Sequence, residues 1–143
     1  LQQATAMGVK RFLLFDSARV EKSFWQSSAL RPDALRAELL LGLEQAGDTV
    51  LPAVERARGF RAFVGEALPA LATGAAIVAA HPEASAAAAL PRGRVALVVG
   101  PEGGFLEHEL AALAAAGARS TSLGPRVLRV ETAVVALLAR CAG

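Results

Sequence analysis

Cysteine, tyrosine and long hydrophobic runs are absent or nearly absent from this 143-residue chain. The single Cys141 excludes a disulfide framework and a cysteine-rich zinc site, so we expect no bound metal and a reduced, cytoplasmic compartment. The longest apolar stretches, such as Gly74–Ala80, are far shorter than the roughly 20 residues that a membrane span needs. No basic segment followed by an apolar run opens the chain either. We therefore expect neither a secreted protein nor a membrane partner.

A large excess of one charge is also missing, because the formal net charge is only +2. Lysine is scarce, however: of 15 basic residues only Lys10 and Lys22 are lysine, and the rest are arginine. Arginine presents a planar fork of donors that matches phosphate and stacks on bases, which suits a nucleic-acid partner. A GC-rich genome produces the same bias, so composition alone leaves this question open.

The order of apolar segments predicts an α/β fold with a mainly parallel sheet flanked by helices. The length fits one domain with a single core, and Pro52 indicates an edge or irregular strand. The continuous apolar run Val95–Val99 is typical of a strand buried on both faces. The expected strands are Val9–Phe15, Thr49–Val54, Ala75–Ala80, Val95–Val99 and Ser120–Leu123; the expected helices are Leu1–Gly8, Asp33–Ala46, Phe60–Leu68 (ended by Pro69), Ala84–Ala89, Leu106–Ala116 and Val130–Cys141.

A glycine-rich turn, Gly100-Pro101-Glu102-Gly103-Gly104-Phe105, links a predicted buried strand to a predicted helix. In open α/β sheets, ligands bind at the carboxyl ends of the strands. The three glycines permit positive φ angles and let a ligand approach the backbone closely. A purely structural turn stays open as the alternative, because the lysine and hydroxyl residue of a phosphate-binding P-loop are absent.

A second segment, Leu123–Ala133, has the sequence L-G-P-R-V-L-R-V-E-T-A and leads into the last predicted helix. Glu131 lies in the first helical turn, where a carboxylate suits the positive end of the helix dipole. Arg129 stands two residues before it. A local salt bridge between Arg129 and Glu131, clamping the start of the helix, is the alternative to a role in a site.

Taken together in this order and spacing, the two segments resemble the bacterial 16S rRNA (uracil-N3)-methyltransferases. That family belongs to the SPOUT class of knotted, S-adenosylmethionine-dependent RNA methyltransferases. The resemblance is strong over residues 75–143 and looser over residues 1–52. It implies a methyltransferase domain over 1–143, with a deep trefoil knot in about 75–143. Family members usually carry a PUA-like domain in front, so we expect an N-terminally truncated domain of a divergent branch.

The resemblance also implies a site for S-adenosylmethionine on three loops that follow strand ends. Apolar walls from Leu123, Val127 and Leu128 suit a flat adenine, and glycine backbone supplies hydrogen bonds. The cofactor-binding residues expected on this basis are Ala80, His81, Gly100, Glu102, Gly103, Leu123, Gly124, Val127 and Leu128.

The reaction that the resemblance implies is methylation of N3 of a uridine in small-subunit ribosomal RNA. N3 must lose a proton, which requires a base or a cation that stabilises the anion. We expect Arg129 to stabilise negative charge on the uracil oxygens. Glu102 is either a base or an organiser of the cofactor and its loop, and the second role is favoured. The expected partners are ribosomal RNA or the small ribosomal subunit, and a second copy of the chain in a homodimer through the knot, because the last helix carries more apolar surface than a small sheet covers.

Two alternatives remain at this point. One is another SPOUT RNA methyltransferase activity, such as ribose 2′-O-methylation, although the N-x-x-R and S-L-N segments usual in that class are absent. The other is a non-catalytic knotted module that binds the cofactor or RNA. Trp25 lies in a polar loop and either stacks on a base or packs against its own domain or a subunit interface.

Overall fold

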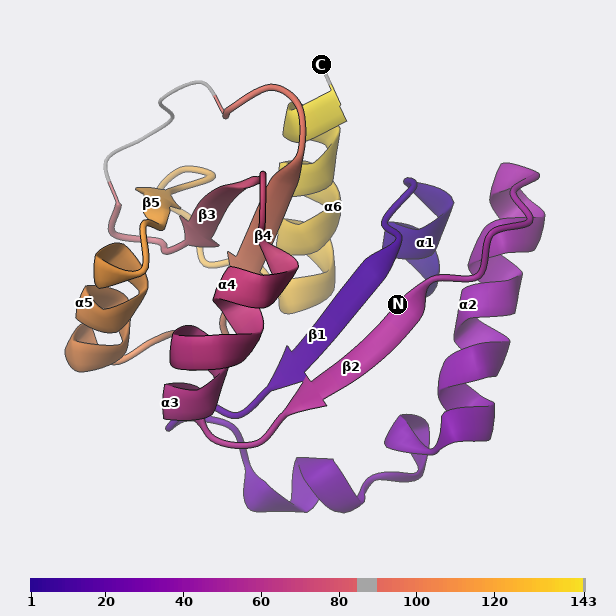
Figure 1. The fold of residues 1–143 in the computed structure, drawn as a ribbon, viewed down its shortest axis with the longest axis horizontal. Helices are drawn as coiled ribbons and strands as arrows, with labels where there is room; N and C mark the ends of the chain where they lie inside the picture. Colours follow the sequence, from indigo (N-terminus) through magenta and orange to yellow (C-terminus); the bar gives the residue numbers. More distant parts are fainter. Residues whose placement is uncertain (85–89, 143) are drawn as a thin grey trace. The chain divides into compact units, whose positions relative to one another are not determined.

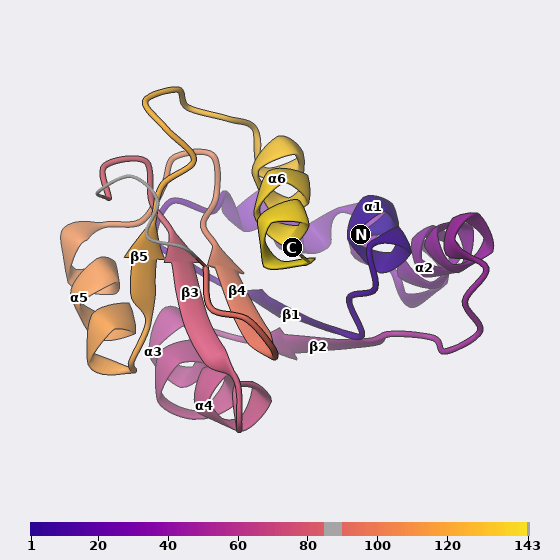
Figure 2. The same ribbon diagram turned by 90° about the horizontal axis from the view of Figure 1, so that it is seen from above.

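The computed structural model describes residues 1–84 and 90–142 and has the expected α/β character, with helices flanking parallel strands (Figures 1 and 2). The chain divides into two compact units. The N-terminal unit consists of Leu1–Leu14 and Val20–Arg56, and the C-terminal unit consists of Phe15–Arg19 and Ala57–Gly143. The short helix expected over Ala84–Ala89 falls, apart from Ala84, outside the described residues.

In the N-terminal unit, two helices pack closely and a two-stranded sheet runs beside them. The arrows of the two strands run in the same direction in Figure 1. A Cβ at Gly42 would lie 2.5 Å from the carbonyl oxygen of Gln2 and 2.6 Å from Cβ of Thr5, so glycine permits the close helix contact. The elements are α1 (Gln2–Ala6), β1 (Arg11–Phe15), the 3₁₀ turns η1 (Lys22–Gln26) and η2 (Ser28–Leu30), α2 (Pro32–Ala46) and β2 (Ala53–Ala57).

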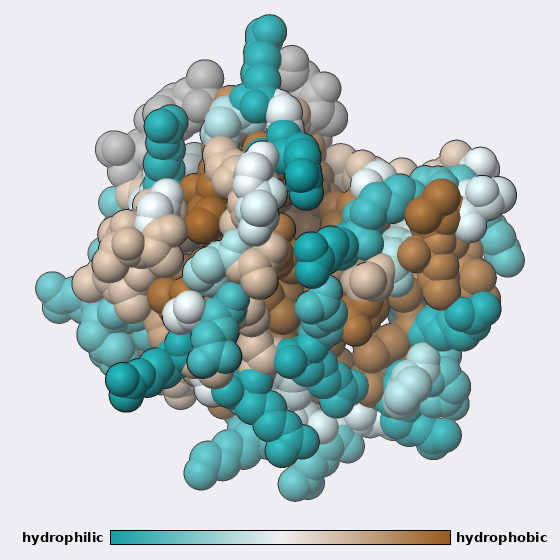
Figure 3. Space-filling model, viewed as in Figure 1, coloured by the Kyte–Doolittle hydropathy of each residue, from teal (hydrophilic) through white to brown (hydrophobic). Residues whose placement is uncertain are grey.

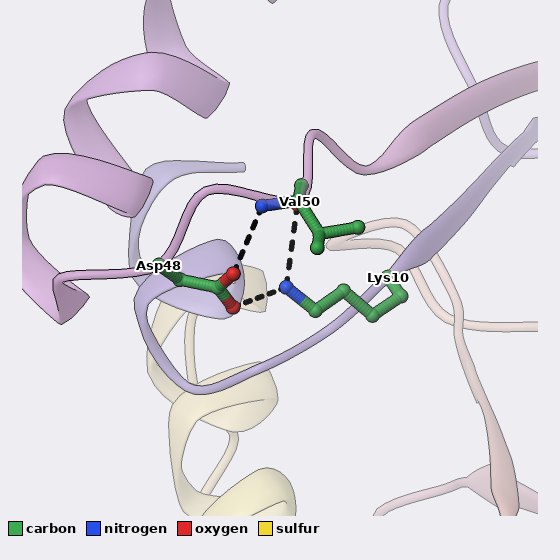
Figure 4. Close-up of polar contacts among 3 residues, drawn as sticks. All are labelled: Lys10, Asp48 and Val50. Carbon is green, nitrogen blue, oxygen red and sulfur yellow. Dashed lines mark hydrogen bonds and ion pairs between the residues drawn. The ribbon is translucent and has the colours of Figure 1, made fainter.

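The strand β2 begins later than the sequence predicts, at Ala53 instead of Thr49. A polar turn occupies the earlier residues (Figure 4): Asp48 accepts a 3.0 Å hydrogen bond from the Val50 amide and pairs with the Lys10 ammonium. Pro52 then has no N–H to give to a neighbouring strand. The hydrogen bond from Lys10, followed by that from Val50, lowers the pKa of the Asp48 carboxyl below its ordinary value.

The C-terminal unit contains a parallel three-stranded sheet in the order β4-β3-β5, formed by β3 (Ala76–Ala80), β4 (Val95–Val99) and β5 (Arg119–Thr121). β5 is shifted from the predicted Ser120–Leu123: it begins one residue earlier and ends at Thr121, because the Ser122 hydroxyl bonds to the turn that follows. The expectation that Val95–Val99 is buried on both faces is wrong. Ala96 and Val98 are buried, but Val95, Leu97 and Val99, whose side chains alternate with them, are partly exposed, so the two faces of the strand are covered unequally.

The helix predicted over Phe60–Leu68 continues to Leu71, so Pro69 does not lie beyond its end. It consists of α3 (Phe60–Ala62), a π-helical turn η3 (Phe63–Ala67) and α4 (Leu68–Leu71). Proline lacks the N–H that an α-helix would use, and it is tolerated within the first two residues after a change in helical geometry. The unit also contains α5 (Glu107–Ala115) and α6 (Val130–Ala142), close to their predicted bounds.

An aromatic cluster forms part of the core of the C-terminal unit. The rings of Phe15 and Phe63 stack with centroids 3.7 Å apart, and Phe60 and Phe105 lie within 6.3 Å of Phe15. Phe105 is buried and is the last residue of the glycine-rich turn, so the cluster anchors one end of that turn. On the described part of the chain, no helix is long and apolar enough to cross a membrane.

Candidate functional site

The carboxyl ends of the three parallel strands meet at one edge of the sheet. In the register of the sheet, Ala80 lies opposite Val99 on one side and Thr121 on the other. The loops that follow these strands line a common pocket of about 90 Å³. The pocket gathers eight of the nine residues expected to bind a cofactor: Ala80, His81, Gly100, Glu102, Leu123, Gly124, Val127 and Leu128. Gly103 is the exception.

The glycine-rich turn uses its three glycines differently. Only Gly104 has a positive φ, of 72°, and its amide donates a 2.8 Å hydrogen bond to the carbonyl oxygen of Pro101. Of the three glycines that permit a positive φ, Gly100 and Gly103 do not adopt one. Gly100 is needed for space, because a Cβ there would lie 3.0–3.2 Å from ring atoms of Phe105.

Arg19 explains why Gly103 does not line the pocket. A Cβ at Gly103 would lie 3.1 Å from Cδ of Arg19, so the arginine side chain runs directly along the turn at that residue. The Arg19 guanidinium donates a hydrogen bond to the carbonyl oxygen of Gly103. The segment Phe15–Arg19 thus supports the glycine-rich turn from outside the pocket.

Glu109, which sequence reasoning missed, holds the same region together. Its side chain is only 1% exposed. One carboxylate oxygen accepts a 2.8 Å hydrogen bond from the amide of Leu106, at the start of α5, and the other accepts a 2.8 Å bond from the amide of Ala18. A glutamate at the third helical residue is half of a capping box, which was the one signal available in the sequence. Its second contact joins residues 91 positions apart and has no local signature.

Ser122 organises the second loop and was also missed. Its buried hydroxyl lies 3.1 Å from the carbonyl oxygen of Pro82 and accepts a 3.1 Å hydrogen bond from the Gly124 amide. Arg140 of α6 donates to the Ser122 carbonyl at 3.3 Å. Gly124 has a φ of 116°, which favours glycine. These contacts fix the loop that follows β5 against the loop that follows β3.

The pocket has apolar walls that the chain itself does not cover. Val127 is 77% exposed and Leu128 is 37% exposed, although both line the pocket. Thr121 also lines it, and its buried hydroxyl has no hydrogen-bond partner among the described residues. Exposed aliphatic side chains next to a hydroxyl without a partner suit a flat, partly apolar ligand such as a nucleoside. The donor set therefore fits the adenosine part of S-adenosylmethionine.

The candidate catalytic side chains are open to solvent. Arg129 does not line the pocket, and its side chain is 80% exposed. Its Nη1 lies 3.9 Å from Oε1 of Glu131, too long for a hydrogen bond, so a clamp between these two groups contributes little to stability. The Glu102 carboxylate lines the pocket and makes no hydrogen bond or ion pair with the described residues.

His81 lies at the rim in a structural turn, because its Nδ1 accepts a 3.3 Å hydrogen bond from the amide of Glu83. Its own amide donates to the carbonyl oxygen of Thr121 at 2.9 Å, which extends the sheet by one step. Within residues 1–84 and 90–142, no group of three or more His, Cys, Asp or Glu side chains is arranged to hold a metal ion.

Comparison with known proteins identifies relatives along nearly the whole chain. The model of the RNA methyltransferase domain matches residues 1–142. Ribosomal RNA small subunit methyltransferase E of Mycobacterium bovis is 34% identical over 96% of this chain and 55% of its own length. The protein of the same name from Treponema pallidum is 28% identical over 97% of this chain and 54% of its own length. The chain thus spans about half the length of these curated relatives.

Solved structures give the same result. Ribosomal RNA small subunit methyltransferase E from Neisseria gonorrhoeae, determined with bound S-adenosylmethionine, aligns with a TM-score of 0.77 at 26% identity, over 96% of this chain and 57% of that one. A Legionella pneumophila protein, also solved with this cofactor, aligns with a TM-score of 0.78 at 28% identity, over 96% and 57% of the two chains. With the family model matched from residue 1 to residue 142, the chain belongs to the RNA methyltransferase family.

Proposed function

We propose that residues 1–143 form the SPOUT-like methyltransferase domain of an S-adenosylmethionine-dependent enzyme that methylates N3 of a uridine in 16S ribosomal RNA. One observation carries the proposal: eight of the nine residues expected at the cofactor site, from three separate loops, line one pocket at the edge of the parallel sheet. The family match and the cofactor in the Neisseria gonorrhoeae structure support the same activity. We further propose a trefoil knot within about 75–143 and a cytoplasmic location.

The pocket would hold the cofactor through backbone and apolar contacts. Backbone groups of Gly100 and Leu123 would bond to the adenine, and the exposed side chains of Val127 and Leu128 would cover its faces. The backbone of Gly124 lines the pocket and is held by the Ser122 hydroxyl. The bound cofactor supplies an electrophilic methyl group on a sulfonium. Glu109 and Ser122 would act indirectly, because they fix the loops that make these contacts.

The uridine requires a path for the N3 proton and a cation near its oxygens. Glu102 lines the pocket and has no partner in the described residues, which favours a role in accepting the N3 proton over the organiser role expected from the sequence. Arg129 is exposed beside the loop, where its guanidinium can stabilise the negative charge that develops on the uracil oxygens. N3 lies on the Watson–Crick edge, so the uridine must be unpaired or flipped from its stack.

A homodimer through the last helix completes the proposal. α6 carries a run of aliphatic side chains, and only Leu137 is fully buried among those whose exposure is described. The others remain partly exposed in the single chain, which is typical of a helix that packs against a second copy. Light scattering at micromolar concentration should give twice the mass of the chain; a monomer mass would contradict this part of the proposal.

Two measurements test the proposed function. Calorimetry should detect S-adenosylmethionine binding to the 143-residue chain, and Val127→Ser should weaken it, while the matched Val50→Ser, at an exposed valine outside the pocket, should not. The longer protein should then methylate undermethylated small subunits, and mass spectrometry of nucleosides should identify 3-methyluridine. A 2′-O-methylated product would indicate the other SPOUT activity. Cofactor binding with no methylated product would indicate a non-catalytic module.

A further inference from the structure

A second cavity lies within the N-terminal unit, apart from the cofactor pocket. It has a volume of about 690 Å³, within the range of about 300–1,000 Å³ typical of small-ligand sites. Its apolar walls come from Leu35 and Leu39 of α2, Pro52 before β2, and Val54 within β2. Figure 3 shows a hollow in this region, between α2 and β2, with hydrophobic walls and hydrophilic side chains around it. None of its lining residues lines the cofactor pocket.

The charged residues that line this cavity are all arginines. Arg31, Arg36 and Arg56 line it, and no carboxylate does. The Arg56 guanidinium donates to the carbonyl oxygen of Leu30 and is held in place. Arg36 makes no ion pair or hydrogen bond with the described residues, so its guanidinium is available to an anion. Arg31 pairs with Asp33 at 3.2 Å, so Arg36 is the lining arginine that has no partner among the described residues. An apolar cavity with such a guanidinium at its wall favours a ligand that has both an apolar surface and a negative charge.

Trp25 supplies a flat surface in the same wall. Its indole meets the ring of Phe24 edge to face, with centroids 6.0 Å apart at 78°. The indole N–H is buried and has no hydrogen-bond partner among the described residues. The indole contacts Phe24 and lines the same cavity as Arg36. An indole and a guanidinium in one cavity are the combination that binds single-stranded nucleic acid, with a base on the ring and a phosphate on the cation.

We propose that this cavity binds one unpaired nucleotide of single-stranded RNA, with its base stacked on Trp25 and its phosphate at Arg36. The inference rests on the proposed function only in that the chain acts on RNA. A free phosphate would leave the apolar walls and the indole unused, and an apolar ligand would leave the Arg36 guanidinium without a counter-charge. The cavity would therefore bind a nucleotide of the substrate strand other than the uridine that is methylated.

The chain has a built-in probe for this proposal, because Trp25 is its only tryptophan. A ten-nucleotide oligouridine should quench the intrinsic fluorescence, since stacking brings a base onto the indole. Trp25→Ala should weaken binding of the same oligonucleotide, labelled for fluorescence polarisation, by about 10-fold or more. Arg36→Ala should weaken it and reduce the slope of the salt dependence by about one. The matched control is Arg61→Ala, at an exposed arginine of α3 that lines neither cavity.

Titrations with inorganic phosphate and with uridine monophosphate show whether the cavity binds a phosphate alone or a whole nucleotide. The proposal expects quenching by the nucleotide and none by phosphate. No quenching by either the oligonucleotide or the nucleotide, or equal weakening by Arg36→Ala and Arg61→Ala, would overturn it. If Trp25→Ala fails to fold, Trp25→Phe and the wild-type quenching decide the matter. Calorimetry with S-adenosylmethionine on the same variants distinguishes this proposal from the proposed function. Unchanged cofactor binding with no quenching by RNA would refute only the RNA-binding role of the cavity. Absent cofactor binding would refute the proposed function.

Discussion

Replacing Glu109 by glutamine tests the support of the glycine-rich turn most directly. The buried carboxylate accepts hydrogen bonds from two backbone amides, those of Leu106 and Ala18, each at 2.8 Å. Glutamine has the same shape but only one accepting oxygen, so its NH₂ group must face one of the two amides. Glu109→Gln thus loses one hydrogen bond to a charged group, and its NH₂ group then faces a backbone N–H, so that two donors point at each other.

The expected size of the effect follows from the exposure of the two amides. Ala18 is exposed, so water can replace its lost bond, whereas Leu106 is half buried. A hydrogen bond to a charged group contributes about 1.5–3 kcal/mol, and the neutral amide recovers part of the cost of burying a charge. We expect Glu109→Gln to lower the free energy of unfolding by about 1–3 kcal/mol. The melting temperature should fall by roughly 3–12 °C for a chain of this size.

Thermal unfolding followed by circular dichroism measures this change, with Glu107→Gln as the control. Glu107 lies two residues earlier in the first turn of α5, is exposed and makes no side-chain hydrogen bond with the described residues, so its loss affects only the helix dipole. The S-adenosylmethionine affinity of Glu109→Gln should also fall, because Leu106 ends the segment that carries the glycine-rich turn. If the two variants melt at the same temperature, the two contacts of Glu109 contribute nothing and the reasoning is refuted.

Three further variants test other parts of the structure. Gly100→Ala should lower the free energy of unfolding by about 1–3 kcal/mol, because its Cβ would press on the ring of Phe105. The melting temperature and the cofactor affinity should both fall, and an unchanged melting temperature would contradict this. Asp48→Asn should destabilise the chain at neutral pH but not at acid pH. The pKa of Asp48 is lower in the folded chain than the value of about 4 of the unfolded chain, so its pair with Lys10 stabilises the fold fully above the unfolded pKa. This stabilisation is lost as the pH falls through the lower pKa of the folded chain. An equal difference in stability between Asp48→Asn and the wild type at every pH would contradict this. Arg129→Ala should reduce the methylation rate about 10²–10³-fold at unchanged melting temperature and cofactor affinity, with Arg129→Lys restoring it only in part; a parallel loss of all three quantities would make Arg129 part of the scaffold.

The parts of the fold that follow local rules were predictable from the sequence. α2 begins at Pro32, one residue before the predicted Asp33, and ends at Ala46 as predicted; Gly47 follows with a positive φ of 64°. β4 has the bounds of its apolar run, and the cofactor loops follow strand ends as the parallel topology requires. The family motifs predicted nine cofactor-binding residues, and eight of them line one pocket.

The errors share a different cause, which is competition from contacts distant in sequence or from side-chain hydrogen bonds. β2 starts late because Asp48 builds a turn with Lys10, 38 residues away. Glu109 reads as an ordinary helix-start residue, and its contact with Ala18 depends on how the two segments are brought together. Pro69 sits inside a helix because a π-turn precedes it, and no spacing of apolar residues predicts such a turn.

The route of the chain between its two units has a consequence for dissecting the protein. The chain passes from one unit to the other after Leu14, after Arg19 and after Arg56, so the C-terminal unit borrows a five-residue segment from the first half of the sequence. A fragment that starts at Ala57 would lack the Phe15 ring that stacks on Phe63, and Glu109 would lose its partner at Ala18. Such a fragment is expected to be unstable alone and to regain structure when a synthetic peptide containing residues 15–19 is added. This segment is therefore a suitable place to divide the chain in a split-protein reporter of RNA methyltransferase folding.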